Sequence, residues 1–511
     1  MKLQAYQIYF TLYLTHMCIF ALFAQNPTVA LSPEIKPDKK EHFIKFLHSD
    51  STGYYMLWEQ RFKKNTILNI TKYNKQWAIA YRKSHMINDG YIDYKSIFHL
   101  NDGLLICTHK KDNKKLSISY HMTYLASDGS TSKSQPVATV DYTSPYQIPR
   151  SFWTLSNDSS KVLLAILNNE NGSEKPTISI TVTDNRGQKL WDKKISMAHG
   201  EKEIDIDSWA ISNDGVVYML AKIFPEGKAE MYCEVYRYSD IESEQSKAYK
   251  IDFGLDPPTY VSGKIDENGT FYCSGLYPQK KNDFSGVFYT RINSKTDQVE
   301  SNIKHKFTAA DWVNTPQNDK HSSEEINLGS NLVYRDILPQ ADGSLLIMAE
   351  RYFTKDITTR SRTVAVIDVR TTTNYYAYDI FNFMLRPDGT LAWLTVIPKK
   401  QIDTNPAFLS YARTSDTAGN IHLFYNDNAK NNTQLLDRPA KPLKHGKLGI
   451  ALTTLTPDGK TKRTILEQVT DTKLSILPQL CAPAGTNKMF LLLAKYPKVG
   501  KPSYRFGIVD L

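Results

Sequence analysis

The 511-residue chain carries 63 Lys and Arg against 53 Asp and Glu, with 41% hydrophobic and 12% aromatic residues. This composition is that of a folded protein and excludes a largely disordered chain. The formal net charge of +10 is spread along the chain without a dense basic block. That spread favours a soluble surface over a nucleic-acid interface, while attraction to an acidic glycan or lipid surface stays open.

The N-terminal residues predict a signal peptide over 1–24. The apolar run from about Ile8 to Phe23 is too short and too mixed to span a membrane comfortably, and the small Ala24 suits a cleavage site. We expect the mature chain to begin at Gln25, with an uncleaved anchor as the alternative. The mature chain would carry no transmembrane helix, and it would be exported to the periplasm, the outer-membrane surface or the extracellular space.

Residues 25–41 contain three prolines and several charges with little pattern, and they predict a flexible tether. Beyond them, turn signals recur to the C-terminus. They separate short apolar or alternating runs typical of β-strands. These turns fall at Asn101-Asp102-Gly103, Asp128-Gly129, Asn185-Arg186-Gly187, Asn213-Asp214-Gly215, Glu267-Asn268-Gly269, Asp342-Gly343, Asp388-Gly389, Gly419-Asn420 and Asp458-Gly459.

The clearest hairpin lies in residues 375–401. Pro387 presets φ for a turn, Gly389 can take a positive φ, and the flanking runs are rich in β-branched and aromatic residues. Weaker versions of the pattern recur about every 27 residues, which gives four strands per roughly 55 residues.

These repeats predict an all-β fold, a β-propeller of seven or eight four-stranded blades, over residues 42–511. A ring of blades buries both faces of each sheet and leaves only short edges. A two-domain all-β protein or two smaller propellers are the alternatives. Irregular inserts are expected near 309–330 and 355–373, where loops could carry function.

Four cysteines remain after the signal peptide, far apart and without a C-x-x-C pair: Cys107, Cys233, Cys273 and Cys481. Their apolar surroundings favour buried free thiols. Because export permits a disulfide, Cys233 with Cys273 is the first pair to consider, but spacing does not fix the pairing.

Three segments resemble recurring motifs of uncharacterised exported β-propeller-like proteins of Bacteroidota. They are LVYRDILPQADGSLLIMAERYF (332–353), YDIFNFMLRPDGTLAWLTVIPKKQ (378–401) and IHLFYNDNAKNN (421–432). The resemblance covers roughly a hundred residues of the C-terminal half. It implies a fold and an exported location, and it brings no catalytic motif with it.

Reaction motifs such as G-x-S-x-G, H-E-x-x-H or a phosphate loop are not found, so no catalytic residue, metal or cofactor is expected. The polar residues 350–352 and 426–428 each follow an apolar run, and these two runs would be equivalent strands of neighbouring blades. Together with residues 399–401, they are expected to line one mouth of the ring, or else to pair with one another and hold loops in place. The candidate binding residues are Glu350, Arg351, Tyr352, Lys399, Lys400, Gln401, Asn426, Asp427 and Asn428.

The function favoured by these features is an exported, non-enzymatic binding or scaffold module in the cell envelope, with an envelope protein or a glycan as partner and no nucleic acid. The alternative is a carbohydrate-active hydrolase or lyase with an acidic site at the mouth of the ring. For that reaction Glu350 and Asp427 would have to stand at a defined separation.

Overall fold

A computed structural model gives the arrangement of the chain from residue 27 to residue 511. Residues 1–26, including the expected signal peptide, lie outside the described part. So do the following internal positions: 39, 63–65, 88–91, 101, 145–147, 169–174, 227–230, 241–246, 252–257, 259, 281–282, 294, 308–310, 312–330, 363–366, 433–438, 444–447, 471–473 and 496–502. The expected insert near 309–330 therefore falls almost entirely outside it.

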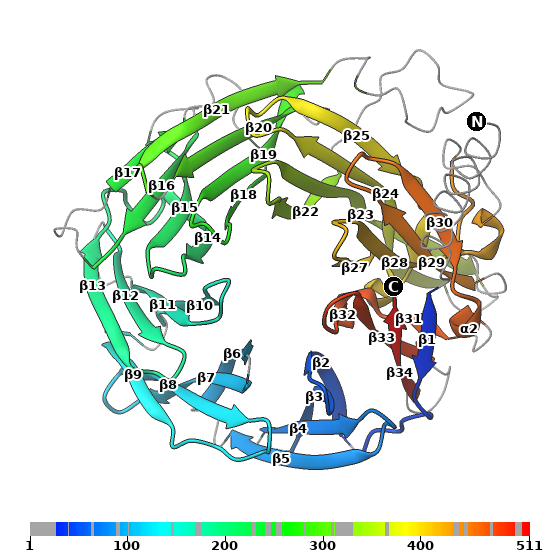
Figure 1. The fold of residues 1–511 in the computed structure, drawn as a ribbon, viewed down its shortest axis with the longest axis horizontal. Coiled ribbons are helices and arrows are strands. Elements are labelled where there is room, and N and C mark those ends of the chain that lie inside the picture. The colour runs from blue at the N-terminus through cyan, green and yellow to red at the C-terminus, as the bar shows by residue number, and fades with distance from the viewer. Residues whose placement is uncertain are drawn as a thin grey trace, which may run out of the picture.

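Eight antiparallel sheets are arranged in a ring, each with its first strand toward the centre (Figure 1). The first four blades contain consecutive strands. They are β2 (Glu41–Ser49), β3 (Gly53–Arg61), β4 (Thr66–Asn74), β5 (Ile79–Ile87); β6 (Ile92–Leu100), β7 (Gly103–Asp112), β8 (Ser117–Ala126), β9 (Gln135–Asp141); β10 (Arg150–Leu155), β11 (Lys161–Asn168), β12 (Thr177–Asp184), β13 (Lys189–Ser196); β14 (Ile204–Ile211), β15 (Val217–Ile223), β16 (Tyr232–Tyr238) and β17 (Lys247–Ile251).

The other four blades follow the same plan, with a fifth strand added in the sixth and the eighth. They contain β18 (Tyr260–Ile265), β19 (Phe271–Lys280), β20 (Asp283–Asn293), β21 (Gln298–Lys306); β22 (Leu332–Pro339), β23 (Leu345–Arg362), β24 (Ile367–Leu385), β25 (Leu391–Ile397), with β26 (Gln401–Asp403) beside β24; β27 (Ala412–Ser415), β28 (Ile421–Asn428), β29 (Leu448–Leu455), β30 (Thr461–Ile465); and β31 (Ser475–Ile476), β33 (Lys488–Lys495), β34 (Ser503–Asp510) and β1 (Thr28–Leu31), with β32 (Ala482–Pro483) beside β33. Short helices are η2 (Pro406–Phe408), η3 (Ala429–Asn431), α2 (Glu467–Thr470) and η5 (Pro478–Leu480).

The fold predicted from the repeats is confirmed, with eight blades. Its turns follow the predicted chemistry. In the hairpin of β24 and β25, Gly389 has φ +83°, and its N–H donates to the carbonyl of Arg386. Asp388 accepts from the N–H of Thr390 at 2.9 Å. An L-residue is disfavoured at that φ, which explains why glycine punctuates these turns.

Apolar clusters hold the blades together at every junction of the ring. One cluster, for example, packs Leu276 and Tyr289 of the fifth blade against Ile347 and Phe383 of the sixth. Another packs Trp58 of the first blade against residues of the eighth. The core is therefore eight wedges between neighbouring sheets rather than one central mass, and the ring is a single unit.

The N-terminal strand closes the ring. Residues 25–41 were expected to form a flexible tether, and this was wrong for Thr28–Leu31, which form β1. β1 pairs with β34, so the outermost strand of the last blade comes from the start of the chain. Val29 and Leu31 pack against the apolar cluster of the seventh and eighth blades.

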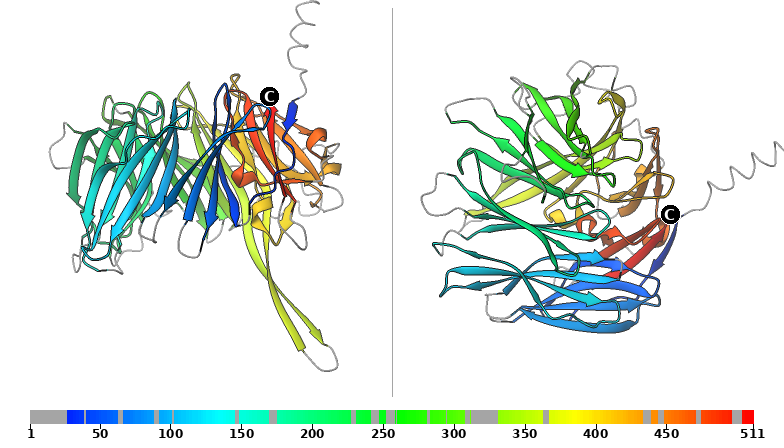
Figure 2. Two further views of the ribbon diagram at one scale, coloured as in Figure 1. Left: turned by 90° about the horizontal axis from the view of Figure 1, so that it is seen from below. Right: turned by 60° about the vertical axis from the view of Figure 1, so that its left-hand side comes forward.

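The second expected insert, near 355–373, is regular rather than irregular. β23 and β24 pair across it as far as Arg362↔Ile367, and the hairpin projects from one face of the ring (Figure 2, left). We call residues 354–374 the arm. Within the described residues, no helix has both the length and the apolar character needed to cross a membrane.

All four cysteines of the described chain are free thiols. The tentative pairing of Cys233 with Cys273 is therefore wrong, and the expectation of free thiols is confirmed. Both of these residues lie in the apolar cluster between the fourth and fifth blades, where burial raises the pKa of each thiol. Buried, protonated thiols of this kind are unreactive packing groups.

A stacked histidine pair joins the first two blades and should make stability depend on pH. The rings of His48 and His99 lie 3.6 Å apart. Burial, with His99 nearby, lowers the pKa of His48 from 6.5 to about 4. Between pH 6.5 and about pH 4, His48 is protonated in the unfolded chain but not in the folded chain. The free energy of unfolding therefore decreases as the pH falls through this range.

His48→Phe keeps a stacking ring but removes this titration. We expect the variant to lose less thermal stability than the wild type between pH 6.5 and about pH 4, as measured by melting temperature. His42→Phe, on the same strand but exposed, is the control and should behave as the wild type does. An unchanged pH dependence in His48→Phe would contradict the assignment.

Candidate functional site

The nine candidate residues lie at the face of the ring where each blade connects to the next. β23, β25 and β28 all run toward this face, because second and fourth strands of an antiparallel blade share a direction. Candidate residues therefore lie at neighbouring places in the sixth and seventh blades. They are Glu350 on β23, Lys399 and Gln401 after β25, and Asn426 on β28.

Glu350 is the most enclosed carboxylate of this group. Its side chain is 0% exposed, and Lys399 Nζ, also 0% exposed, lies 2.8 Å from its Oε1. Arg335 Nε donates to Oε2 at 2.8 Å, and Ser410 Oγ donates to the same oxygen at 2.7 Å. Burial acts to raise the pKa of Glu350, but Lys399 and Arg335 outweigh it and hold that pKa below its usual range. Glu350 is therefore ionised, with hydrogen bonds to one oxygen and the ion pair with Lys399 at the other.

Lys399 and Gln401 extend the network across the blades. Lys399 Nζ donates to the carbonyl of Ala377 at 3.0 Å and to Gln401 Oε1 at 2.9 Å. The Gln401 oxygen also accepts from the N–H of Ser410 at 2.8 Å, and its Nε2 donates to the carbonyl of Asn426 at 2.7 Å. Every polar group of this amide is used, which is what a buried amide requires.

Asn426 carries the network into the eighth blade. Its Nδ2 donates to the carbonyls of Phe408 and Ile476, both at 2.8 Å, and its Oδ1 accepts from the N–H of Ile476 at 3.0 Å. Three blades are thus joined by side-chain hydrogen bonds to the main chain.

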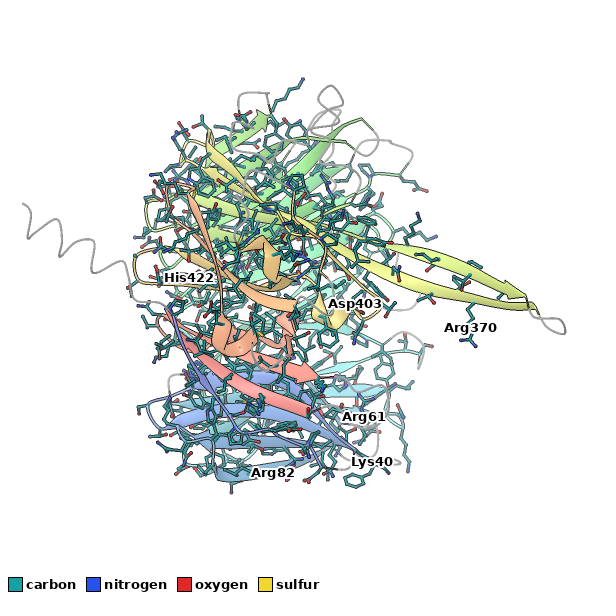
Figure 3. All side chains as sticks on the ribbon, turned by 90° about the vertical axis from the view of Figure 1, so that its right-hand side faces the viewer. Lys40, Arg61, Arg82, Arg370, Asp403 and His422 are labelled. Atoms are coloured by element: carbon teal, nitrogen blue, oxygen red, sulfur yellow. The ribbon has the colours of Figure 1, made fainter. Side chains whose placement is uncertain are left out.

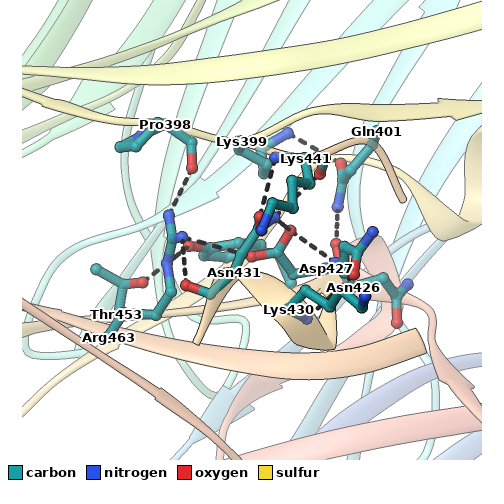
Figure 4. A network of polar contacts seen from close by, with 12 residues as sticks. Pro398, Lys399, Gln401, Asn426, Asp427, Lys430, Asn431, Lys441, Thr453 and Arg463 are labelled. Atoms are coloured by element: carbon teal, nitrogen blue, oxygen red, sulfur yellow. Dashed lines mark hydrogen bonds and ion pairs between the residues drawn. The ribbon is translucent and has the colours of Figure 1, made fainter. Parts of the chain in front are cut away.

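Asp427 lies beside this chain of contacts (Figure 4), and Asn428 follows it at the end of β28. Asp427 accepts from Asn431 Nδ2 at 2.7 Å, and Arg463 Nη1 lies 3.7 Å from its other oxygen. Burial raises the pKa of Asp427, and Arg463 opposes that shift. Asn428 Nδ2 donates to the carbonyl of Pro442 at 2.8 Å, which fastens a loop. Like Glu350, the Asp427 side chain is 0% exposed, and its Oδ2 is buried without a hydrogen-bond partner among the described residues.

The remaining three candidates, Arg351, Tyr352 and Lys400, are partly exposed and border the network. Arg335 lies over the Tyr352 ring at 5.0 Å, and Lys400 over the Tyr378 ring at 5.7 Å. Arg351 lies 5.8 Å from the centre of the Phe381 ring. Such contacts steady long side chains at the surface.

The network stands at the root of the arm. β22 pairs with β23 as far as Arg351, one residue beyond Glu350, and Ala377, which accepts from Lys399, pairs with Tyr352 of β23. β26 pairs with residues 375–377 of β24, through Ala377↔Gln401 among others. The residues chosen from the sequence therefore anchor both strands of the projecting hairpin to three blades.

Several residues of the network were not identified from the sequence. They are Arg335, Ser410, Asn431 and Arg463. Ser410 has φ +72°, an uncommon value for a residue other than glycine, and the surrounding contacts hold it there. The Arg335-Asp336 pair inside the apolar strand LVYRDILP was the one available signal, since charges in such a run need partners.

The arm itself is exposed on both faces (Figures 2 and 3). All residues of 354–359 and 369–373 are exposed, with Ile357 at 39% and Val369 at 53%. Figure 3 shows Arg370 on the arm, well away from the ring. Opposite pairs such as Thr358 and Thr371, whose hydroxyls lie 3.1 Å apart, keep the two strands in register.

Comparisons with known proteins found matches among solved structures alone. No family model and no curated protein matches the chain. Among solved structures, the β-propeller domain of the Trilobed protease from Pyrococcus furiosus is similar at 12% identity and a TM-score of 0.35, over 83% of this chain and 98% of that one. A mutant of Synechocystis apocarotenoid oxygenase is similar at 8% identity and a TM-score of 0.34, over 94% and 93%. At these values neither likeness bears on activity, and the chain stands as an eight-bladed propeller with an anchored arm.

Proposed function

We propose that the protein is an exported binding module of the cell envelope that holds a protein partner through its arm. The observation that carries the proposal is the regular β-ribbon of residues 354–362 and 367–374, exposed at 354–359 and 369–373 and fastened to a rigid ring. Two-stranded hairpins are marginally stable in water by themselves, so a long one that is anchored at its root is suited to a partner. The exported location rests on the N-terminal sequence and on the resemblance to exported propeller-like proteins.

The chemistry of the arm favours a protein over a glycan. Residues 354–374 contain no aromatic side chain, whereas stacking on aromatic rings is a usual way to hold a sugar. Beyond the contacts of the arm's root with β22 and β26, both outer edges of the ribbon lack a neighbouring strand among the described residues. Unpaired edges accept an added strand of another protein through main-chain hydrogen bonds.

The test is capture of a partner by the mature chain, from Gln25 onward, and by a variant with a shortened arm. Residues 356–373 are replaced by Asn-Gly, because Lys355 and Asn374 are paired and a two-residue turn can join them. We expect the full chain to capture a stoichiometric protein from envelope extract and the shortened chain to lose it.

A double substitution gives a finer test. Ile357→Thr with Val369→Thr removes the two exposed apolar side chains without shortening the ribbon, and we expect weaker capture. Leu190→Thr, at a similarly exposed apolar residue of β13, is the matched control and should leave capture unchanged. Retention of the same partner by the shortened chain, or capture of polysaccharide alone, would refute the proposal.

A further inference from the structure

The innermost strand of the sixth blade contains a β-bulge at a charged residue, Arg335. In the pairing of β22 with β23, Tyr334 is opposite Ala349 and Asp336 is opposite Met348, so Arg335 has no residue across from it. β14 has the same irregularity between Ile206 and Ser208. Bulges of this kind re-aim side chains and are over-represented next to functional sites.

Next to this bulge, charged groups from three adjacent innermost strands meet. Asp336 of β22 accepts from Lys264 Nζ of β18 at 2.5 Å and from Arg413 of β27. The exposed fractions of these side chains are 42% for Lys264, 27% for Arg413 and 20% for Asp336. The cluster therefore lies on the inner wall of the ring and is reached by solvent.

On the solvent-reached wall two cations, Lys264 and Arg413, share the single carboxylate of Asp336. Buried Lys399 behind it has Asp379 as a neighbour besides Glu350. Four cations, namely Lys264, Arg335, Lys399 and Arg413, contact two carboxylates, Asp336 and Glu350. Both carboxylates are ionised in this setting, since the neighbouring cations hold the pKa of each below its usual range against the opposing effect of burial. Arginines whose charge is only partly compensated are suited to bind carboxylate or phosphate groups.

A further donor lies within this group. The hydroxyl of Tyr411 is buried and has no hydrogen-bond partner among the described residues. It is within electrostatic reach of Arg335, Arg413 and both carboxylates. Buried hydroxyls are rarely left unpaired, because an unsatisfied one costs about 1–3 kcal/mol.

We propose that the inner wall formed by β18, β22 and β27 binds a small ligand through its carboxylate or phosphate group. Lys264 and Arg413 would hold the anion, Arg335 would add charge from the bulge, and Tyr411 would donate a hydrogen bond to it. This site shares Arg335 with the network at the root of the arm, but it does not use the arm itself and stands whether or not the arm binds a protein.

The experiment is titration calorimetry of the mature chain with inorganic phosphate and, separately, with succinate, against sodium chloride at equal ionic strength. We expect saturable binding of at least one of the two anions, with Kd below about 1 mM. Binding of phosphate alone would indicate a phosphate ligand, and binding of succinate alone would indicate a carboxylate ligand. Failure of both to bind more tightly than chloride overturns the proposal.

Variants then locate the binding. Arg413→Gln is expected to weaken it at least tenfold, and Tyr411→Phe to weaken it less while leaving the fold intact. Arg291→Gln is the matched control, because Arg291 is a similarly exposed arginine paired with Glu300 on an outer strand. Should Arg413→Gln fail to fold, Lys264→Gln replaces it, since Lys264 is the most exposed member. Unchanged affinity in the folded variant would place the anion elsewhere and refute the site.

Discussion

Lys399→Met is expected to destabilise the protein by about 3–5 kcal/mol, because it leaves a buried carboxylate without its closest cation. Glu350 and Lys399 are both 0% exposed. In the variant, Glu350 keeps only Arg335 and Ser410, while the carbonyls of Ala377 and Gln401 lose a donor. Urea unfolding would measure the change as a fall in midpoint at an unchanged slope.

Two further variants separate the ion pair from general disruption. Lys400→Met, one residue along and partly exposed, should shift stability by less than about 1 kcal/mol. Combining Lys399→Met with Glu350→Gln removes the buried charge as well, so it should recover part of the loss. Equal losses in Lys399→Met and Lys400→Met would show that the buried pair is not what stabilises this region.

The arm should respond together with the ring. Lys399 contacts the main chain of β24 at the place where the arm leaves the blade. In Lys399→Met, amide hydrogen exchange is therefore expected to increase first at residues 375–377, which β26 holds in the wild type. The network thus ties the stability of three blades to the position of the arm.

Local turn chemistry made the repeated architecture predictable. Gly215, Gly343 and Gly459 all have φ between +82° and +87°, as tight turns of this kind require. Since each turn joins two strands of one blade, counting turns gave the number of strands. In the structure, buried and half-buried residues alternate along strands such as β8, as the two faces of a strand require.

The role of the candidate residues was not predictable in the same way. Strand equivalence placed Glu350, Lys399 and Asn426 at one face of the ring, and the structure has them in one network. What the sequence could not give is their complete burial, because lysine is almost never fully buried without a partner. Those partners come from distant positions, since Ser410 lies 60 residues beyond Glu350.

The arm was misjudged for a different reason. Residues 355–373 are rich in Thr and Arg, a composition that suits an exposed loop. They form strands because β23 and β24 are already paired in the blade, and the pairing continues outward from that nucleus. Tertiary context, not local pattern, extends the ladder.

The ring-closing strand β1 has the second large expected effect. It is four residues long, lies between Pro27 and Pro33, and pairs with a partner about 480 positions away, from Thr28↔Asp510 to Leu31↔Gly507. Nothing local marks so short a strand, and long-range pairing is costly in chain entropy before it forms. Once formed, it covers the outer edge of β34.

Removing residues 25–31 should therefore lower the melting temperature and make the protein associate. Val29 and Leu31 no longer pack on the last blade, and partial burial of two such side chains contributes about 3 kcal/mol. The freed edge of β34 exposes main-chain donors and acceptors that can pair with another copy. Differential scanning calorimetry and light scattering would show both changes.

A chain that begins at Pro27 keeps β1 and serves as the control, and it should match the mature chain in both measurements. A synthetic peptide of residues 27–36 added to the shortened chain should restore the melting temperature, because it can refill the edge as an added strand. If the shortened chain stayed monomeric with an unchanged melting temperature, closure by β1 would not contribute to stability. The seven remaining inter-blade clusters would then hold the ring by themselves.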